Sequence, residues 1–168
     1  YYTLCSYDDD SASASQKERV KRAYRPKRNR IISLGYAESR DGVHWEKPKL
    51  GLVEFEGSTD NNLLFRYAHG TGIFLDEEEK DPQKRYKLVT KVEYPGGYAY
   101  MAVNFSEDGV HFGPMRPWPR YNPPADSHNF PLRDKKDGKF KLFTRTWMNG
   151  MRIEVMSESA DFINWSEP

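Results

Sequence analysis

Ser, Asp and His recur at fixed spacing in this sequence, at residues 39–45 and again at 106–112. The two stretches read Ser-Arg-Asp-Gly-Val-His-Trp and Ser-Glu-Asp-Gly-Val-His-Phe, and residues 159–165 keep Ser-x-Asp-x-x-x-aromatic. Such side chains could contact a ligand. They could equally build a turn, because Ser and Asp fold back onto backbone N–H groups and Gly permits positive φ. We interpret the stretch as a tight turn between strands, with the final aromatic residue packed beneath it.

These turns define a tandem organisation. Ser39, Ser106 and Ser159 lie 67 and 53 residues apart, and a period near 50 with strands in each unit is typical of propeller blades. Each complete unit reads strand, hairpin loop, strand, turn, strand, turn motif. We therefore predict an all-β fold and a single partial propeller domain over 1–168. Its expected parts are an incomplete blade at 1–56, a blade at 57–113 and a blade at 114–168, about two and a half four-stranded antiparallel blades.

The composition agrees with β structure. Aromatic residues make up 14% of the 168 residues, and the formal net charge is +1, which argues against a strongly electrostatic partner for the whole molecule. The single Cys5 excludes an internal disulfide, and no apolar run is long enough to span a membrane. Since propellers need four or more blades to close, we expect a fragment, or an arc completed by other chains.

A basic segment interrupts the first unit. Eight of the fourteen residues from 17 to 30 are Lys or Arg, a density that could bind phosphates. The alternative is a solvated hairpin loop over residues 8–30, part of it helical. We favour the loop and predict no nucleic-acid partner, because the chain offers no second basic stripe.

Residues 36–48, 57–62, 126–129, 139–145 and 159–168 carry a resemblance to a known group of proteins. They resemble the five-bladed propeller superfamily of glycosidases, which includes glycoside hydrolase families 32, 43 and 130. The similarity is greatest to bacterial proteins of the family 32 N-terminal-like group. It implies a five-bladed propeller whose innermost strands line a central funnel, with acidic residues near the starts of those strands meeting the sugar.

The resemblance implies catalytic carboxylates at the openings of the units. Hydrolysis of a glycosidic bond needs one carboxyl group as acid and another as base or nucleophile. Asp126 is the best candidate, and Asp60 is its counterpart one blade earlier, although an Asp before a strand is commonly a turn former. For the general acid the candidates are Glu93 and Glu154, and Glu93 could instead be a solvated turn residue.

Amide, basic and aromatic side chains are the candidates for sugar binding. They are Asn61, Asn62, His128, Asn129, Arg145 and Trp147. The amides could instead cap the strand backbone. Arg145 could pair with a carboxylate such as Asp126 or bridge blades, and Trp147, like Trp118, could be packing rather than a sugar-stacking surface. His128 has no accompanying metal-ligand spacing, so we predict no metal and no cofactor.

The family pattern is incomplete here. The sequence lacks the Trp-Met-Asn-Asp-Pro-Asn, Arg-Asp-Pro and Glu-Cys stretches that hold catalytic groups in family 32. Either missing blades from the parent chain or another subunit supply them, or the protein does a different job. The expected function is a secreted or periplasmic glycoside hydrolase acting on oligo- or polysaccharide. The alternative is a non-catalytic carbohydrate-binding or scaffolding propeller module.

Overall fold

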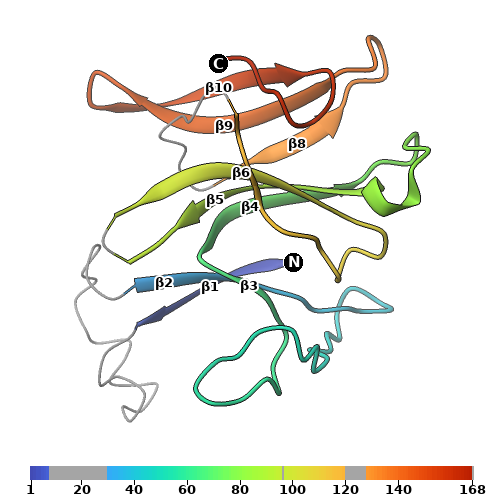
Figure 1. The fold of residues 1–168 in the computed structure, drawn as a ribbon, viewed down its shortest axis with the longest axis vertical. Helices are drawn as coiled ribbons and strands as arrows, with labels where there is room; N and C mark the ends of the chain where they lie inside the picture. The colour runs from blue at the N-terminus through green and yellow to red at the C-terminus, as the bar shows by residue number, and fades with distance from the viewer. Residues whose placement is uncertain (8–29, 96, 120–127, 168) are drawn as a thin grey trace.

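The computed structural model describes residues 1–7, 30–95, 97–119 and 128–167 (Figure 1). These residues form an all-β fold of three antiparallel sheets. The first sheet contains β1 (Tyr2–Tyr7), β2 (Arg30–Gly35) and β3 (Leu63–Arg66), in that order. The second contains β4 (Ala68–Leu75), β5 (Tyr86–Glu93), β6 (Ala99–Ser106) and β7 (Arg116–Pro117). The third contains β8 (Phe130–Arg133), β9 (Phe140–Met148) and β10 (Met151–Ser159).

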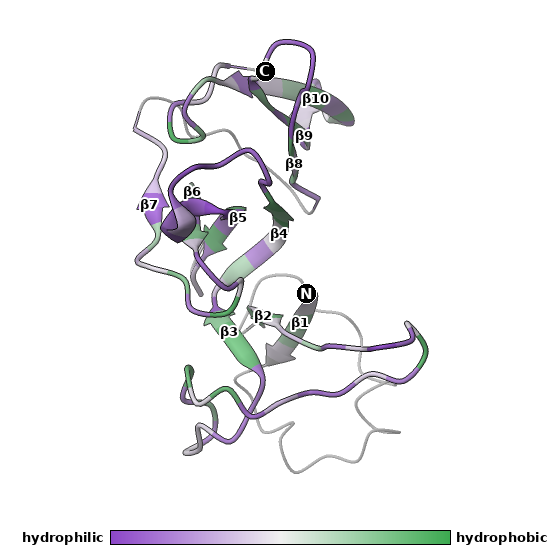
Figure 2. Cartoon of the chain, turned by 90° about the vertical axis from the view of Figure 1, so that its right-hand side faces the viewer, coloured by the Kyte–Doolittle hydropathy of each residue, from purple (hydrophilic) through white to green (hydrophobic). Residues whose placement is uncertain are grey.

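The three sheets follow one another along the long axis of the molecule (Figures 1 and 2). Sheet neighbours are also sequence neighbours, so the second and third sheets are meanders, as the sequence predicts. In the described part of the chain the one helical segment is the short 3₁₀ helix η2 (Pro82–Lys84), in the loop between β4 and β5. None of the described helical structure is long and apolar enough to cross a membrane. The basic segment at 8–29 lies outside the described residues.

Two hydrophobic clusters hold the sheets together, because side chains of a strand alternate between its faces. The larger lies between the second and third sheets and contains Val89, Met101, Val103, Phe105, Trp118, Phe140, Leu142, Phe162 and Trp165. The smaller joins the first and second sheets and contains Leu34, Leu64, Ala68 and Leu88. In Figure 2, β3 is coloured as hydrophobic, whereas connecting loops are largely hydrophilic. Each sheet therefore packs face to face on the next.

The turn interpretation is confirmed in its hydrogen bonds. Ser106 Oγ accepts from the backbone N–H of Asp108 and Gly109, and Asp108 Oδ1 accepts from Val110 N–H at 2.8 Å and His111 N–H at 2.7 Å. The first turn repeats these contacts around Ser39 and Asp41. The third turn has the Asp-centred contacts, but Phe162 adopts φ 67° where the other turns have Gly.

Acid is expected to weaken the third turn. Burial raises the pKa of Asp161, but hydrogen bonds from Asn164 and Ile163 outweigh it and lower the pKa from 3.8 to about 2. A depressed folded-state pKa stabilises the fold above 3.8, and this contribution is lost as pH falls towards 2. We expect Asp161→Asn to flatten the pH dependence of the unfolding free energy over that interval, measured by urea denaturation. Asp134→Asn, in another hairpin loop, is the control, and an unchanged slope in Asp161→Asn would contradict the prediction.

The aromatic residue that ends each turn is buried to a different extent in the three turns. Trp165 is buried and stacks on Trp118, with ring centroids 5.7 Å apart, and Phe112 packs against Phe65 at 5.8 Å. Trp45 is 60% exposed, so the prediction that it tucks beneath its turn is wrong. Its indole N–H instead donates to Gly42 O within the turn. The stacking of Trp118 supports the packing interpretation of that residue over sugar stacking.

The pairing of β3 corrects one assignment. By sequence alone, residues 63–65 and 72–75 favour a single strand of the blade at 57–113, broken by residues 67–71. Instead, β3 pairs with β2 and completes the first sheet, and β4 opens the second sheet at Ala68. Between them Tyr67 takes φ 66°, a left-handed conformation that is strained for a bulky residue. The single broken strand favoured by the sequence is thus two strands, β3 and β4, that belong to different sheets.

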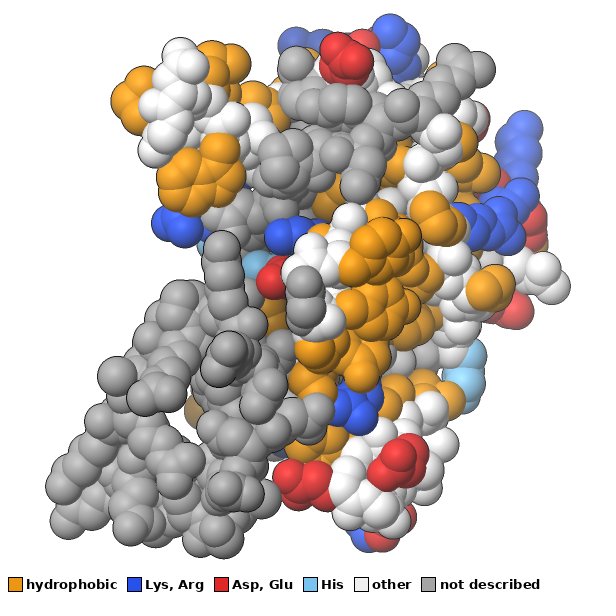
Figure 3. All heavy atoms as spheres, turned by 60° about the vertical axis from the view of Figure 1, so that its left-hand side comes forward, with side chains coloured by type: hydrophobic (Ala, Val, Ile, Leu, Met, Phe, Trp, Pro, Cys, Tyr) orange, Lys and Arg blue, Asp and Glu red, His pale blue; other side chains and the backbone are white. Residues whose placement is uncertain are grey.

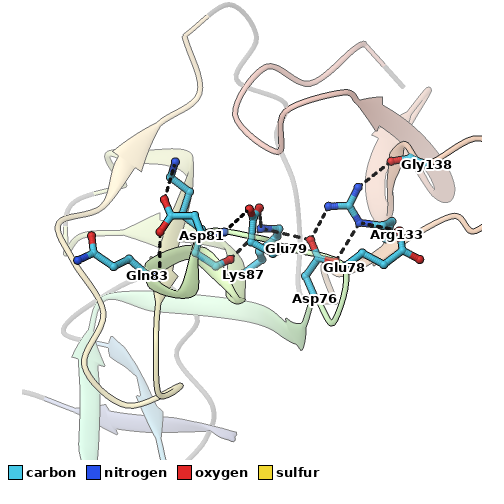
Figure 4. A network of polar contacts seen from close by, with 9 residues as sticks. Asp76, Glu78, Glu79, Asp81, Gln83, Lys87, Arg133 and Gly138 are labelled. Carbon is cyan, nitrogen blue, oxygen red and sulfur yellow. Dashed lines mark hydrogen bonds and ion pairs between the residues drawn. The ribbon is translucent and has the colours of Figure 1, made fainter.

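Polar contacts tie the loop after β4 to the third sheet (Figure 4). The guanidinium of Arg133, at the end of β8, donates to both carboxylate oxygens of Asp76, at 2.9 and 2.6 Å. Lys87, 1% exposed, lies 3.3 Å from Asp76 and 2.8 Å from Glu79. Burial raises the pKa of Asp76, but these two cations outweigh it and hold the pKa below its usual range. These ion pairs among Arg133, Asp76, Lys87 and Glu79 therefore help to fix β8 beside β4.

Candidate functional site

A carboxylate, an imidazole and an ammonium group meet where β4 begins and β5 ends. His69 Nδ1 lies 2.7 Å from Glu93 Oε2, and Lys91 Nζ lies 3.3 Å from the same oxygen. The three side chains are 14%, 25% and 22% exposed. They are thus held largely inside the protein while keeping access to solvent.

The hairpin of β4 and β5 positions this group. His69 is the register partner of Lys91, and the Glu93 N–H donates to Tyr67 O at 2.8 Å. The register shifts between His69 and Gly72, a bulge of the kind that re-aims side chains. Thr90 and Thr71 close the bulge through hydroxyl groups 2.7 Å apart. The geometry therefore depends on strand pairing as well as on local sequence.

The start of the third sheet lies against the same bulge. Asn129 donates through its backbone N–H and its side-chain amide to Gly70 O, at 3.1 and 2.7 Å. Thr144 Oγ1 donates to Asn129 Oδ1 at 2.8 Å. A chain of contacts thus runs from β9 through Asn129 to the β4 residue next to His69. The starts of β4 and β8 are brought together at one edge of the two sheets.

The electrostatic surroundings favour an ionised Glu93. Burial raises the pKa of this carboxyl, but the hydrogen bond with His69 and the charge of Lys91 outweigh burial and hold the pKa below its usual range. A carboxylate that is ionised at neutral pH can serve as a base or a nucleophile, whereas a general acid needs a raised pKa. Glu93 therefore fits the role of base or nucleophile better than the general-acid role expected from the sequence.

Several predicted sugar-binding residues lie around this edge. His128 is exposed and takes φ 78°, and Asn129 follows it. Gly72 pairs with Val89 in the second sheet as Phe130 pairs with Phe143 in the third. The residues two positions earlier, Gly70 and His128, therefore correspond, and Gly70 also has a positive φ, of 61°. A strained non-glycine residue beside a candidate site is an indication of function.

Arg145 and Trp147 follow on β9. Arg145 is half-buried and is the register partner of Glu154 on β10. Trp147 is 51% exposed, with the Arg152 guanidinium 4.9 Å from its ring. The exposed indole remains available for a ligand, although the structure does not place it in contact with the group around Glu93.

Asp60, Asn61 and Asn62 lie elsewhere. They precede β3, whereas Glu93 and His69 lie at the opposite end of that strand. Asp60 forms an exposed ion pair with Lys49 at 2.5 Å.

The amide groups of this segment hold backbone. Asn61 Nδ2 donates to Val53 O at 2.7 Å, and Asn62 Nδ2 donates to Tyr36 O at 2.5 Å and to Tyr2 Oη at 2.6 Å. These contacts correspond to the capping alternative for Asn61 and Asn62. The structure does not bring Asp60, Asn61 or Asn62 to Glu93.

Asp126, the leading catalytic candidate, and Ser127 lie outside the described residues. Within the described ranges, no group of three His, Cys, Asp or Glu side chains is arranged to hold a metal ion. Cys5 is exposed and free. The described part of the site thus consists of Glu93, His69, Lys91 and Asn129.

His69 and Lys91 are the functional candidates that sequence reasoning missed. A single His between Ala and Gly carries no periodic signal. Strand pairing starts at Leu75 and Tyr86, so counting outward along the two strands would place His69 opposite Val92. The bulge between His69 and Gly72 instead sets His69 opposite Lys91.

No protein-family model, curated protein or solved structure matches this chain. The class that the structure defines is an all-β protein of three stacked antiparallel sheets, with a Glu–His–Lys group at one edge.

Proposed function

We propose that this protein is carbohydrate-active and is a glycoside hydrolase acting on oligo- or polysaccharide. The observation that carries the proposal is the ionised Glu93, held by His69 and Lys91 where β4 and β8 begin. An oriented carboxylate beside hydrogen-bonding side chains suits a sugar and its leaving group. The motif resemblance adds a secreted or periplasmic location.

We further propose that the three sheets are blades of a five-bladed propeller. The correspondence between consecutive sheets supports this architecture. Residues 86–91 of β5 read Tyr-Lys-Leu-Val-Thr-Lys, and residues 140–145 of β9 read Phe-Lys-Leu-Phe-Thr-Arg. Each segment pairs with the strand before it in the same register. The starts of β4 and β8 would then line the funnel, which places Glu93 and Asn129 at its mouth.

The free face of the third sheet supports a continuation of the same packing. Phe140 and Leu142 point towards the second sheet, so Phe143 points away from it. Phe130, Phe143 and Met156 form a cross-strand row that is 65%, 48% and 42% exposed. Val89 and Val103 occupy the positions in the second sheet that Phe143 and Met156 occupy in the third, and both are buried against the third sheet. Missing blades, from the parent chain or another subunit, would cover this row.

The proposed chemistry divides two roles between two carboxyl groups. Glu93, kept ionised, acts as base or nucleophile, and a second carboxyl protonates the leaving oxygen. We assign the second role to Asp126, which stands two positions before His128 in the sequence. His69 and Lys91 orient Glu93, and Asn129 fixes the neighbouring backbone of β4.

The test is turnover of oligosaccharides and aryl glycosides by the full-length protein. We expect Glu93→Gln to lower kcat about a hundredfold, because the amide keeps the shape but cannot act as a base or nucleophile. Asp126→Asn should cause a similar loss. Glu107→Gln, an exposed residue of the second turn, is the matched control. If both site variants retain wild-type turnover, the roles assigned to Glu93 and Asp126 are wrong, and if the unmodified protein turns over none of these substrates, the hydrolase assignment is wrong.

The second candidate function is a non-catalytic carbohydrate-binding or scaffolding module. Exposed aromatic rings favour it, since Trp147 and Tyr98 present their surfaces without needing an acid and base pair. The same panel separates the two functions. Binding that survives Glu93→Gln, with no turnover by the unmodified protein, would support the binding module and exclude the hydrolase.

A further inference from the structure

Four tyrosines form a cluster next to Glu93. Tyr94, Tyr98 and Tyr100 come from the β5–β6 hairpin, and Tyr67 comes from the junction of β3 and β4. The ring centroids of Tyr67 and Tyr94 are 4.8 Å apart, and Tyr94 and Tyr98 are nearly parallel at 6.1 Å. Tyr100 contacts Tyr98 at 5.8 Å and Tyr94 at 6.5 Å.

The outer part of this tyrosine cluster faces solvent. Tyr98 is 68% exposed and Tyr94 is 38% exposed. The end of the β5–β6 hairpin, at the left of Figure 1, comes forward in Figure 3, where a contiguous hydrophobic patch lies beside side chains of both charges and a His. An exposed aromatic patch beside polar groups is typical of an interaction site.

The backbone holds the rings in place. Tyr94 N–H donates to Tyr98 O at 2.9 Å and closes the hairpin. Tyr67 links the cluster to the candidate site, because its ring packs on Tyr94 while its carbonyl accepts the Glu93 N–H at 2.8 Å. Its positive φ of 66° is strain retained at this junction. Tyr67 therefore joins the tyrosine cluster to the backbone of Glu93, the last residue of β5.

We infer that the tyrosine cluster is a stacking subsite for a pyranose ring of an oligosaccharide whose neighbouring sugar lies at Glu93. The inference rests on the proposed function. The C–H groups of one pyranose face are apolar and match an open tyrosine ring, while hydroxyl groups at the sugar's edge suit hydrogen bonding to the polar rim. The subsite would make the protein prefer chains over monosaccharides.

The experiment measures affinities of the full-length protein by calorimetry. The probes are gluco-, xylo- and manno-tetraoses and their monosaccharides, compared for Tyr98→Ala, Tyr98→Phe and Glu93→Gln. We expect Tyr98→Ala to weaken tetrasaccharide binding about tenfold and to leave monosaccharide binding unchanged. Tyr98→Phe keeps the ring and should stay within about threefold of the unmodified protein. Trp45→Ala, an exposed aromatic residue of the first turn, is the control.

The outcomes separate the subsite from the proposed function. If Tyr98→Ala leaves tetrasaccharide affinity unchanged while Glu93→Gln alters binding or turnover, the subsite is wrong and the proposed function stands. If Tyr98→Phe weakens binding as much as Tyr98→Ala, the hydroxyl group rather than the ring is responsible, and stacking is wrong. If the unmodified protein binds none of these sugars, both are overturned.

Discussion

Replacing Lys87 with Met is expected to lower the free energy of unfolding by about 3–5 kcal/mol. The ammonium group is 1% exposed, donates to Glu79 and to Lys84 O at 2.8 Å each, and lies 3.3 Å from Asp76. It also lies 5.4 Å from the Phe105 ring centroid. Its removal would leave buried carboxylate charge with Arg133 alone to neutralise Asp76, which is 2% exposed. Removing one member of a buried charged network is strongly destabilising.

Urea denaturation of Lys87→Met beside Lys84→Met tests this prediction. Lys84 also pairs with a carboxylate, Asp81 at 3.1 Å, but its side chain is 46% exposed. An exposed pair contributes about 1 kcal/mol or less, so Lys84→Met should be nearly neutral. Equal effects of the two substitutions would show that the buried network does not stabilise the fold. A large effect restricted to Lys87 would show that the buried network contributes strongly to the stability of the fold.

Gly72→Ala is expected to destabilise the protein by about 3 kcal/mol and to disturb the candidate site. A Cβ atom at this position would lie 1.8 Å from Asn129 O and 2.5 Å from Pro131 Cδ. The closer atom belongs to the backbone, so a side-chain rotation cannot relieve the overlap. β8 must move away from β4, which would break the hydrogen bonds from Asn129 to Gly70 O.

Gly113→Ala provides the matched control for this substitution. Its Cβ would meet Asn104 Oδ1 at 3.6 Å, an ordinary contact, so its stability should change by about 0.5 kcal/mol or less. Thermal unfolding measures both variants, and sugar binding by Gly72→Ala reports on the site. Wild-type stability of Gly72→Ala would mean that β4 and β8 are not packed as closely as the structure shows.

Lys87→Met and Gly72→Ala both act on the contact between β4 and β8, which we call the β4–β8 seam. Lys87 and Arg133 lie at one end of this seam, and Gly72 and Asn129 lie at the other. Glu93 and His69 project from the strand pair that borders this seam. Anything that separates the second and third sheets should therefore also disturb the arrangement of Glu93 and His69.

Local features could be read from the sequence because their causes are local. The turns at 39–45 and 106–112 form through contacts of Asp and Ser with N–H groups two or three residues away. The all-β class and the hairpins of the second and third sheets follow from alternating apolar residues and turn residues. Glu93 could be proposed because it ends a predicted strand.

The position of β3 and the role of His69 could not be read in this way. A short apolar strand such as β3 could pair at the edge of either of two neighbouring sheets. Packing between residues distant in sequence selects β2 as its partner strand. His69 meets Glu93, 24 residues away in the sequence, only through the register and bulge of a hairpin. The same reasoning explains why Asn61 and Asn62 were predicted to bind sugar. Their sequence resembles the opening of a strand, but their side-chain amides donate hydrogen bonds to backbone carbonyls distant in sequence or in a neighbouring loop.

Local interactions were enough to predict the strand content, the turns and the repeated order of strands, since side-chain alternation and Asx-type hydrogen bonds act over a few residues. Contacts between residues distant in sequence set which strand closes each sheet, where β4 meets β8, and which carboxylate meets a His and a Lys. Those choices depend on close approach between backbones, as at Gly72 and Asn129, and on charges that become buried only when two sheets pack together.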